Sequence, residues 1–303
     1  MQPWERYASL VDDPDAFRSA CRHPLPTVVR VNPIKSTPER AIRALERDGI
    51  AVTRRAWSPN ILELDTDTPG RTWPYQHGFI HGQEELSQLP PRILEPGGDD
   101  VVWDAAAAPG GKATQLAAMV RSGGGILVAN DVNLGRLAAL RSNADRLGVD
   151  NAVVTRQDAR RYSMGALDTD AFDRALVDAP CSGEGTIRKN PRVTEEWNED
   201  TLPEIAVVQR GLLKRAVELT RPGGVVVYAT CTFAPEENEG VLDSIVRDLD
   251  CAIEPYDVPL EHSEGVRSWG ERTYHPSVGH VKRFFPHQND TGGFTCAKLR
   301  VGG

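Results

Sequence analysis

From residue 100 onward, short apolar runs alternate with longer amphipathic stretches, and this alternation restricts the fold more than any other feature. The runs that have the pattern of strands are residues 101–103, 126–129, 152–154, 175–177 and 225–228. The stretches typical of helices are residues 113–120, 134–147, 202–219 and 236–246. Such alternation predicts an α/β fold built on a doubly wound, Rossmann-like parallel sheet. We expect residues 294–299 to add a final antiparallel strand.

A smaller α+β unit is predicted before this region. Residues 28–32 and 61–64 have the apolar pattern of strands. Between them, Ser36-Thr37-Pro38-Glu39 combines a capping residue, an early proline and an acid, and therefore predicts the start of a helix. An apolar stripe carries this helix to about Gly49.

The boundary between the two regions is predicted at a turn-rich stretch. Residues 67–70, Asp-Thr-Pro-Gly, are interpreted as a linker, which predicts a small N-terminal domain over residues 1–70 and a catalytic domain over residues 71–303. Residues 78–87 are interpreted as the entry into a helix that Pro90 and Pro91 interrupt.

Composition and charge exclude several classes of protein. The net charge of -8 argues against a broad basic surface for nucleic acid. The five cysteines are odd in number, widely spaced and without a C-x-x-C pair, so we expect neither a disulfide framework nor a metal site. No apolar run approaches the roughly 20 residues of a membrane span, and the N-terminus lacks a hydrophobic signal segment. A cytoplasmic monomer without membrane contact is expected.

Two cysteines follow predicted buried strands. Cys181 lies in Asp178-Ala179-Pro180-Cys181-Ser182-Gly183, after the run 175–177, and Cys231 follows the run 225–227. Ligands collect at the carboxyl edge of such sheets, so these thiols and the carboxylate of Asp178 are expected in one cleft. A single cysteine after a strand is more often a core residue, but two in this setting favour chemistry. We hypothesise that one thiol forms a covalent bond to substrate.

The loop after residues 101–103 is rich in small residues. It consists of Ala105, Ala106, Ala107, Ala108, Pro109, Gly110, Gly111 and Lys112. Small residues let a ligand approach the backbone at the start of a helix. The loop matches neither the P-loop, which needs glycine at position 106 and a hydroxyl at 113, nor the G-x-G-x-x-G fingerprint. A nucleoside ligand without a pyrophosphate is therefore predicted.

Carboxylates at successive strand ends support this ligand. Asp131 is positioned to accept the ribose hydroxyls, and Asp158 to accept an adenine amino hydrogen. Each acid alone is more readily interpreted as a loop residue or helix cap, but together with Asp178 they indicate a site. S-adenosylmethionine is the cofactor that fits.

Methylation of carbon 5 of a pyrimidine would use two cysteines and a carboxylate, the groups found after residues 175–177 and 225–227. This carbon is a poor nucleophile until a thiolate adds at carbon 6, and a base must later remove the carbon 5 proton so that the thiol leaves. An acid at ring N3 stabilises the charge that develops. Methylation of nitrogen needs neither cysteine. A zinc deaminase is excluded because Glu184 stands where its second cysteine would follow Pro180-Cys181.

These motifs resemble the RNA cytosine-C5 methyltransferases of the Sun family. The matching motifs are Asp104 with residues 107–112, residues 178–183, Thr230-Cys231-Thr232 with Pro235-Glu236-Glu237-Asn238-Glu239, Arg30-Val31-Asn32-Pro33 and residues 290–294. The resemblance runs over nearly the whole chain. It implies a class I S-adenosylmethionine-dependent methyltransferase sheet. One departure is Ala106, where the family usually has cysteine; we expect a change in packing and none in chemistry.

The resemblance also implies roles for the site residues. Cys231 would be the nucleophile, and Cys181 would assist proton removal or product release. Asp178 would hold the base, Lys112 would contact or order it, and Asp131 and Asp158 would bind the cofactor. DNA cytosine methyltransferases attack instead with a cysteine resembling Cys181, so the presence of Cys231 favours RNA.

An RNA partner follows from the resemblance, with tRNA favoured over rRNA because the compact chain resembles archaeal tRNA-modifying members. The target cytosine must leave its stack, so we interpret residues 1–70, with Arg30, Arg54 and Arg55, as an RNA-guiding domain. A plain lid on the sheet is the alternative for this domain. The alternative function is a non-catalytic RNA-binding or assembly factor with the same fold.

Overall fold

A computed structural model describes residues 2–165, 167 and 169–302 of the chain. The chain forms two compact units. Unit 1 comprises Met1–Leu25 and Asp158–Gly303, and unit 2 comprises Pro26–Gln157. We describe each unit by itself. The functional division at residue 70 stays a prediction.

Unit 2 begins with a four-stranded antiparallel sheet in the order β2-β3-β1-β4. Its elements are β1 (Thr27–Val31), α2 (Pro38–Arg47), β2 (Val52–Arg54), β3 (Ile61–Leu64), η2 (Pro69–Arg71), α3 (Trp73–Gln76) and β4 (Ile80–Gly82). Thr37 caps α2 by accepting the N–H of Arg40 through its side chain. Ala41 and Leu45 of α2 pack into the same buried cluster as Val29. The predicted strands and helix are confirmed, whereas the short strands β2 and β4 were not predicted.

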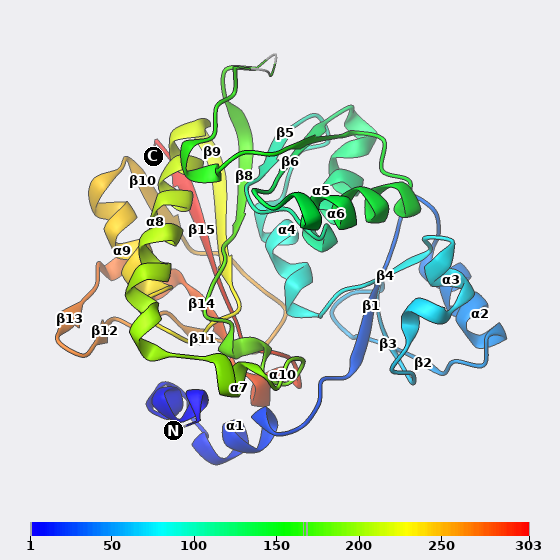
Figure 1. The fold of residues 1–303 in the computed structure, drawn as a ribbon, viewed down its shortest axis with the longest axis horizontal. Coiled ribbons are helices and arrows are strands. Elements are labelled where there is room, and N and C mark those ends of the chain that lie inside the picture. The colour runs from blue at the N-terminus through cyan, green and yellow to red at the C-terminus, as the bar shows by residue number, and fades with distance from the viewer. Residues whose placement is uncertain (1, 166, 168, 303) are drawn as a thin grey trace. The chain divides into compact units, whose positions relative to one another are not determined.

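The second part of unit 2 contains three parallel strands. They are β5 (Val101–Asp104), β6 (Ile126–Asn130) and β7 (Ala152–Thr155), paired in this order. The accompanying helices are η3 (Leu86–Gln88), α4 (Leu89–Leu94), α5 (Gly111–Val120), η4 (Arg121–Gly123) and α6 (Leu134–Leu147), labelled in Figure 1 where there is room. The prediction for residues 78–91 was wrong in two respects. Residues 80–82 form β4, and Pro90 and Pro91 open α4, where a missing N–H costs nothing.

Unit 1 contains a sheet with the strand order β11-β14-β15-β9-β8. Its strands are β8 (Phe172–Asp178), β9 (Thr220–Thr230), β11 (Ser263–Glu264), β14 (Lys282–Phe284) and β15 (Phe294–Val301), and β10 (Cys251–Glu254) also pairs with β15. The pair β8–β9 is parallel, and β15 runs antiparallel to β9, as predicted. A separate hairpin joins β12 (Ser268–Trp269) to β13 (Arg272–Thr273).

Unit 1 contains three helices of four or more residues between β8 and β10, together with short helical turns. They are η5 (Ala159–Arg161), η6 (Glu184–Thr186), α7 (Val193–Glu196), η7 (Glu199–Thr201), α8 (Leu202–Leu219), α9 (Glu239–Asp248) and η8 (Pro276–His280). Helix α8 packs on β8 and β9 and against α9, as Figure 1 shows. The predicted helix over residues 236–246 begins at Glu239, because Asn238 and the residues before it form a buried turn.

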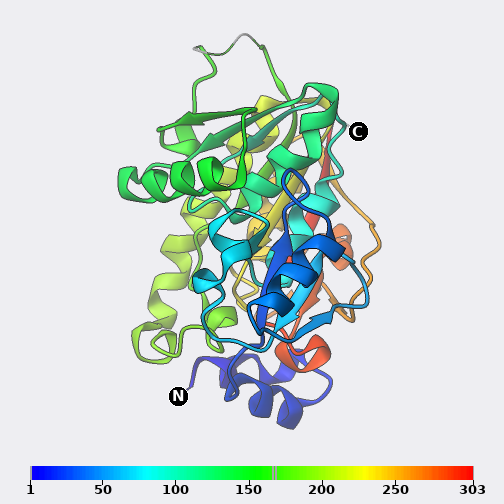
Figure 2. The same cartoon turned by 90° about the vertical axis from the view of Figure 1, so that its right-hand side faces the viewer.

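The first residues of the chain pack in unit 1 beside its last helix. They form η1 (Pro3–Leu10) and α1 (Pro14–Cys21), and α1 contacts α10 (Pro286–Asn289), as Figure 2 shows in blue and red. The contact is aromatic: the ring of Phe17 lies edge-on to Phe233 and Phe285, with centroids 5.3 and 5.7 Å away. This packing brings Tyr7 to the interior of the unit.

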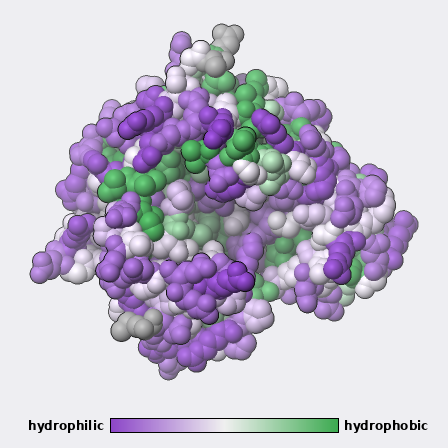
Figure 3. Space-filling view, viewed as in Figure 1, coloured by the Kyte–Doolittle hydropathy of each residue, from purple (hydrophilic) through white to green (hydrophobic). Residues whose placement is uncertain are grey.

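Hydrophilic residues cover most of the face drawn in Figure 3, with a hydrophobic patch over α8 and α9. A groove of about 740 Å³ lies there, between η1, α8, α9 and the β12–β13 hairpin, and its lining contains none of the predicted site residues. Across the described parts of the chain, no helix combines the length and apolarity that crossing a membrane requires.

Candidate functional site

The two cysteines at the predicted strand ends meet in unit 1. Strands β8 and β9 are parallel neighbours with Asp178 opposite Ala229, so the loops that follow them leave the sheet at the same edge. Cys181 and Cys231 lie on these loops with their sulfur atoms 3.2 Å apart. Both thiols are free and half-buried. The prediction that the two thiols lie together is therefore confirmed, and the cleft that they would share with Asp178 stays a prediction.

Close backbone packing holds the loop of Cys181 against the loop of Cys231. The N–H of Ala179 donates to the carbonyl of Ala229, and the N–H of Gly185 donates to the carbonyl of Cys231, each at 2.9 Å. A Cβ atom on Gly185 would lie 2.7 Å from the Cys231 carbonyl oxygen and 2.3 Å from that of Gly293. Only glycine fits there, so residue 185 determines how closely the two cysteine loops approach.

The environment distinguishes the two thiols. The hydrogen bond with Cys231, burial and the negative charge of Glu237 raise the pKa of Cys181 well above its ordinary value. Cys181 therefore stays a thiol at neutral pH and can donate its proton toward the Cys231 sulfur. Asp178, the last residue of β8, is half-buried three positions before Cys181.

The small-residue loop in unit 2 connects β5 to α5 and is held by Asp131. This carboxylate is buried, with 2% exposure; Oδ2 accepts the N–H of Ala108 at 3.3 Å, and Oδ1 accepts the N–H of Asn133 at 2.8 Å. Arg136 lies 3.4 Å from Oδ2. Each carboxylate oxygen has a second lone pair, so Asp131 can accept further hydrogen bonds.

The loop runs directly into helix α5, as the sequence predicts. Ala107 and Ala108 are buried, Ala106 is half-buried and Pro109 is exposed. Gly110 adopts φ +109°, a conformation other residues rarely take, and Gly111 begins the ten-residue helix α5. Lys112, the second residue of α5, is half-buried. Small side chains, a helix start and a buried carboxylate suit the nucleoside part of S-adenosylmethionine.

Asp158 has a local partner. Its side chain caps η5, and its Oδ2 lies 2.7 Å from the Nη2 of Arg160. Hydrogen bonding with Arg160 lowers the pKa of Asp158. Within unit 1 the structure brings Cys181, Cys231 and Asp178 to one sheet edge, and within unit 2 it joins Asp131 to the small-residue loop. The predicted adenine contact of Asp158 remains a prediction.

The three arginines assigned to RNA guidance make protein contacts. Arg30 is buried, with its Nε donating to Gln83 at 2.8 Å and its Nη2 to Thr114 at 3.0 Å. Arg54 pairs with Glu39, and Arg55 pairs with Glu63 and Glu85. Arg30 therefore serves the packing of unit 2, because burial removes its guanidinium from any surface that RNA could touch.

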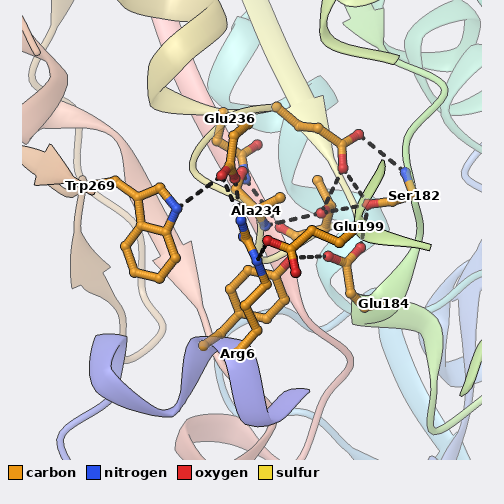
Figure 4. A network of polar contacts seen from close by, with 11 residues as sticks. Arg6, Ser182, Glu184, Glu199, Ala234, Glu236 and Trp269 are labelled. Carbon is orange, nitrogen blue, oxygen red and sulfur yellow. Dashed lines mark hydrogen bonds and ion pairs between the residues drawn. The ribbon is translucent and has the colours of Figure 1, made fainter. Parts of the chain in front are cut away.

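Sequence reasoning missed a cluster of buried acids behind the cysteines. Glu184 and Glu237 are fully buried and both lie within hydrogen-bonding distance of the Ser182 hydroxyl, as Figure 4 shows for Ser182 and Glu184. A signal was present: the run 235–239 carries three acids directly after a buried strand and a cysteine, where exposed acids are not expected.

Comparison with known proteins gives consistent matches. The family model described as 16S rRNA methyltransferase RsmB/F matches residues 91–300. A protein of Pyrococcus abyssi named tRNA (cytosine(49)-C(5))-methyltransferase is 36% identical over 300 residues, which are 98% of this chain and 94% of that protein. Ribosomal RNA small subunit methyltransferase F of Vibrio parahaemolyticus is 34% identical over 94% of this chain, which spans 59% of that relative.

A solved structure agrees in fold. The methyltransferase homolog protein from Pyrococcus horikoshii has a TM-score of 0.81 and 31% identity, with 96% of this chain and 91% of that chain covered. These matches confirm the predicted Rossmann-like fold class.

Proposed function

This chain belongs to the family of RNA cytosine-C5 methyltransferases described as RsmB/F, and from that membership we propose that Cys231 attacks a cytosine in tRNA. The single observation that carries the mechanism is the 3.2 Å separation of the Cys181 and Cys231 sulfur atoms at the ends of neighbouring parallel strands. A pair of unoxidised thiols at a sheet edge suits covalent chemistry on a pyrimidine.

In the proposed reaction, the Cys231 thiolate forms a bond to carbon 6 of cytosine, and the electron pair of the 5,6 double bond becomes available at carbon 5. Bound S-adenosylmethionine supplies a methyl group on a sulfonium, which is the electrophile for carbon 5. Transfer of the methyl group would leave a neutral thioether as the leaving group. A base then takes the carbon 5 proton, and the electron pair of that C–H bond restores the 5,6 double bond. The bond from sulfur to carbon 6 breaks, and its electron pair returns to Cys231.

Cys181 assists the last step. Its raised pKa keeps it a thiol, and its sulfur is 3.2 Å from the Cys231 sulfur. It can therefore donate a hydrogen bond to Cys231 as that sulfur leaves carbon 6, which stabilises the departing thiolate. Asp178 would hold ring N3, because it ends the strand that carries the Cys181 loop, and Lys112 would contact the base.

The residues that the family resemblance assigns to the cofactor have these proposed roles. Asp131 would accept the ribose hydroxyls through its remaining lone pairs, and Ala106, Ala107, Ala108, Pro109, Gly110 and Gly111 would let the nucleoside lie against the backbone. Asp158 would accept the adenine amino hydrogen, and Asp178 would complete this side of the site.

Asp131→Ala is expected to weaken S-adenosylmethionine binding by about tenfold to a hundredfold, since hydrogen bonds to a charged group contribute about 1.5–3 kcal/mol. Calorimetric titration of the purified variant measures this Kd. Asp150→Ala is the matched control: Asp150 is an exposed carboxylate of the same unit paired with Arg121 at 2.8 Å, and its loss is expected to leave the Kd unchanged. Equal affinity of Asp131→Ala and wild type would remove Asp131 from the site.

The choice of tRNA is supported by the extent of the match. The relative named for tRNA is matched over 94% of its length, whereas the chain spans about 60% of the bacterial relatives named for rRNA. The test is methylation of unmodified tRNA and of 16S rRNA fragments with labelled cofactor, followed by mapping of 5-methylcytosine. The proposal requires label in tRNA; label confined to rRNA would assign the rRNA substrate instead, and binding without transfer to either would favour a non-catalytic factor.

A further inference from the structure

Each of the two cysteines is followed by a residue with a hydroxyl group, and both hydroxyls meet one carboxylate. Ser182 follows Cys181, and its N–H donates to Glu237 Oε2 at 3.1 Å. Thr232 follows Cys231, and its hydroxyl donates to Glu237 Oε1 at 3.1 Å. The two hydroxyl oxygens are 3.0 Å apart. Glu237 thus contacts both cysteine loops one residue beyond the sulfur.

Gln209 connects Glu237 to the main chain on the other side of Cys181. Its side-chain amide, on α8, donates to Glu237 Oε2 at 2.7 Å and to the carbonyl of Pro180 at 2.9 Å. Gln209 is fully buried. Gln209 therefore holds the main chain at residue 180, and Glu237 holds it at residue 182. Because Gln209 also donates to Glu237, the two side chains together constrain the loop on both sides of the thiol.

A second acid reaches the same hydroxyl from the opposite direction. Glu184 Oε2 lies within hydrogen-bonding distance of Ser182 Oγ, and Glu184 Oε1 accepts the hydroxyl of Tyr7 at 2.6 Å. Tyr7 belongs to η1, the first helical segment of the chain. Figure 4 shows Ser182 directed toward Glu184, with dashed contacts between them.

The number of protons available limits the charge of this cluster. Three contacts join the hydroxyl groups of Ser182 and Thr232 to carboxylate oxygens of Glu184 and Glu237, but the two hydroxyl groups supply only two protons. If both carboxylates were ionised, Ser182 could donate to only one of them, and its lone pairs would face the other. A carboxylate oxygen that faces hydroxyl lone pairs with no proton between them is repelled in a buried site, so one carboxyl group must carry a proton.

We infer that Glu184 and Glu237, joined through the Ser182 hydroxyl, share one proton and together act as positioning residues that hold the Cys181 loop against Cys231. The inference rests on the proposed roles of the two cysteines. The pair touches no reacting atom. It acts through Ser182 and Thr232, the residues that directly follow Cys181 and Cys231.

The charged and titratable groups around the pair agree with a shared proton. Glu237 faces Glu184, Cys181 and the hydroxyl of Tyr228, which donates to its main-chain carbonyl, and Glu184 faces Tyr7. In the described residues neither acid forms an ion pair with a basic side chain; the neighbouring Arg6 is held by Glu236 and Glu199, drawn in Figure 4, and Arg283 by Glu239. Burial, reinforced by the charge of Glu184, raises the pKa of Glu237 to about 7.

The first test measures how the stability of the protein depends on pH. A carboxyl pKa that rises from 4.5 in the unfolded chain to about 7 in the fold adds stability below pH 4.5, and this stability is lost as the pH rises toward 7. For the full-length protein in urea, the unfolding constant should increase by on the order of a hundredfold across this interval because of this group. In Glu237→Gln an amide N–H replaces the shared proton, so the variant should fold and lack this component.

Glu195→Gln is the matched control, because Glu195 is an exposed carboxylate of the same unit. It should retain the pH dependence of the wild type. The double variant Glu184→Gln/Glu237→Gln should unfold at lower urea than either single variant, since two amide groups would then crowd the Ser182 hydroxyl with donors. Identical pH profiles of the wild type and Glu237→Gln would overturn the shared proton.

The second test concerns positioning. Glu237→Ala removes the contact between the loops and should lower turnover by about a hundredfold while a covalent protein–RNA adduct accumulates, although both cysteines are present. Glu237→Gln should restore turnover and Glu195→Ala should leave it unchanged. General unfolding would lower the amount of adduct rather than raise it.

The experiments distinguish failure of the positioning role from failure of the covalent mechanism. If Cys181→Ala accumulates adduct and folded Glu237→Ala does not, the positioning role is wrong and the covalent mechanism stands. If neither variant forms adduct and Cys231→Ala remains active, the covalent mechanism is wrong, whereas the pH dependence of unfolding still decides whether the acids share a proton.

Discussion

Cys231→Ala is expected to lower the rate of RNA methylation by at least about a thousandfold, because carbon 5 of cytosine is not activated without addition of sulfur at carbon 6. The measurement is transfer of label from S-adenosylmethionine to tRNA under single-turnover conditions. Binding of the cofactor should be unchanged, since Cys231 is not among the residues proposed to hold it.

Cys251→Ala is the matched control for the loss of a thiol. Cys251 is half-buried in β10, at the other edge of β15 from β9, and should be replaceable without loss of activity. Equal rates for Cys231→Ala and the wild type would show that the covalent mechanism is wrong. Intact RNA binding with no transfer by the wild type itself would point to the non-catalytic alternative.

Cys181→Ala is expected to accumulate a covalent adduct between the protein and RNA. Addition through Cys231 remains available, whereas release loses the thiol that lies 3.2 Å from the departing sulfur and should slow by about a hundredfold or more. A species of reduced mobility on a denaturing gel, containing both protein and labelled RNA, is the readout.

The double variant Cys181→Ala/Cys231→Ala identifies the bond. It should form no adduct, because the sulfur that attacks carbon 6 is absent. An adduct that persists in the double variant would assign the attack to another residue, and its absence from Cys181→Ala despite confirmed RNA binding would contradict the proposed division of labour.

The regular part of the fold was predictable from the sequence because its signals are local. The parallel strands are continuous apolar runs, so β5, β6, β7, β8 and β9 were all found, although β7 is a partly exposed edge strand, and α6 and α8 were predicted with their observed bounds. The short strands β2, β4, β11 and β14 were not. Each is a run of only two or three residues, which carries no periodicity, and β4 also pairs with a strand distant in sequence.

The site was predictable only in part. Cys181 and Cys231 were expected together because parallel strands place their carboxyl ends at one edge, and the structure confirms it. The burial of Glu237 and of Arg30 was not predicted, because charged side chains are seldom buried without partners. Those partners, Gln209 and Thr114 respectively, lie on helices whose packing only the folded chain reveals.

The order of the two units along the chain affects how the protein is made. Unit 2 is one uninterrupted segment, whereas unit 1 consists of the first 25 residues and everything from Asp158 onward. During synthesis on the ribosome, unit 2 can complete its contacts as soon as it emerges. The leading segment that carries Tyr7 and Phe17 must wait until its partners Glu184 and Phe285 have been translated. The contact of Tyr7 with Glu184, next to the Cys181 loop, therefore forms only after unit 2 has been translated.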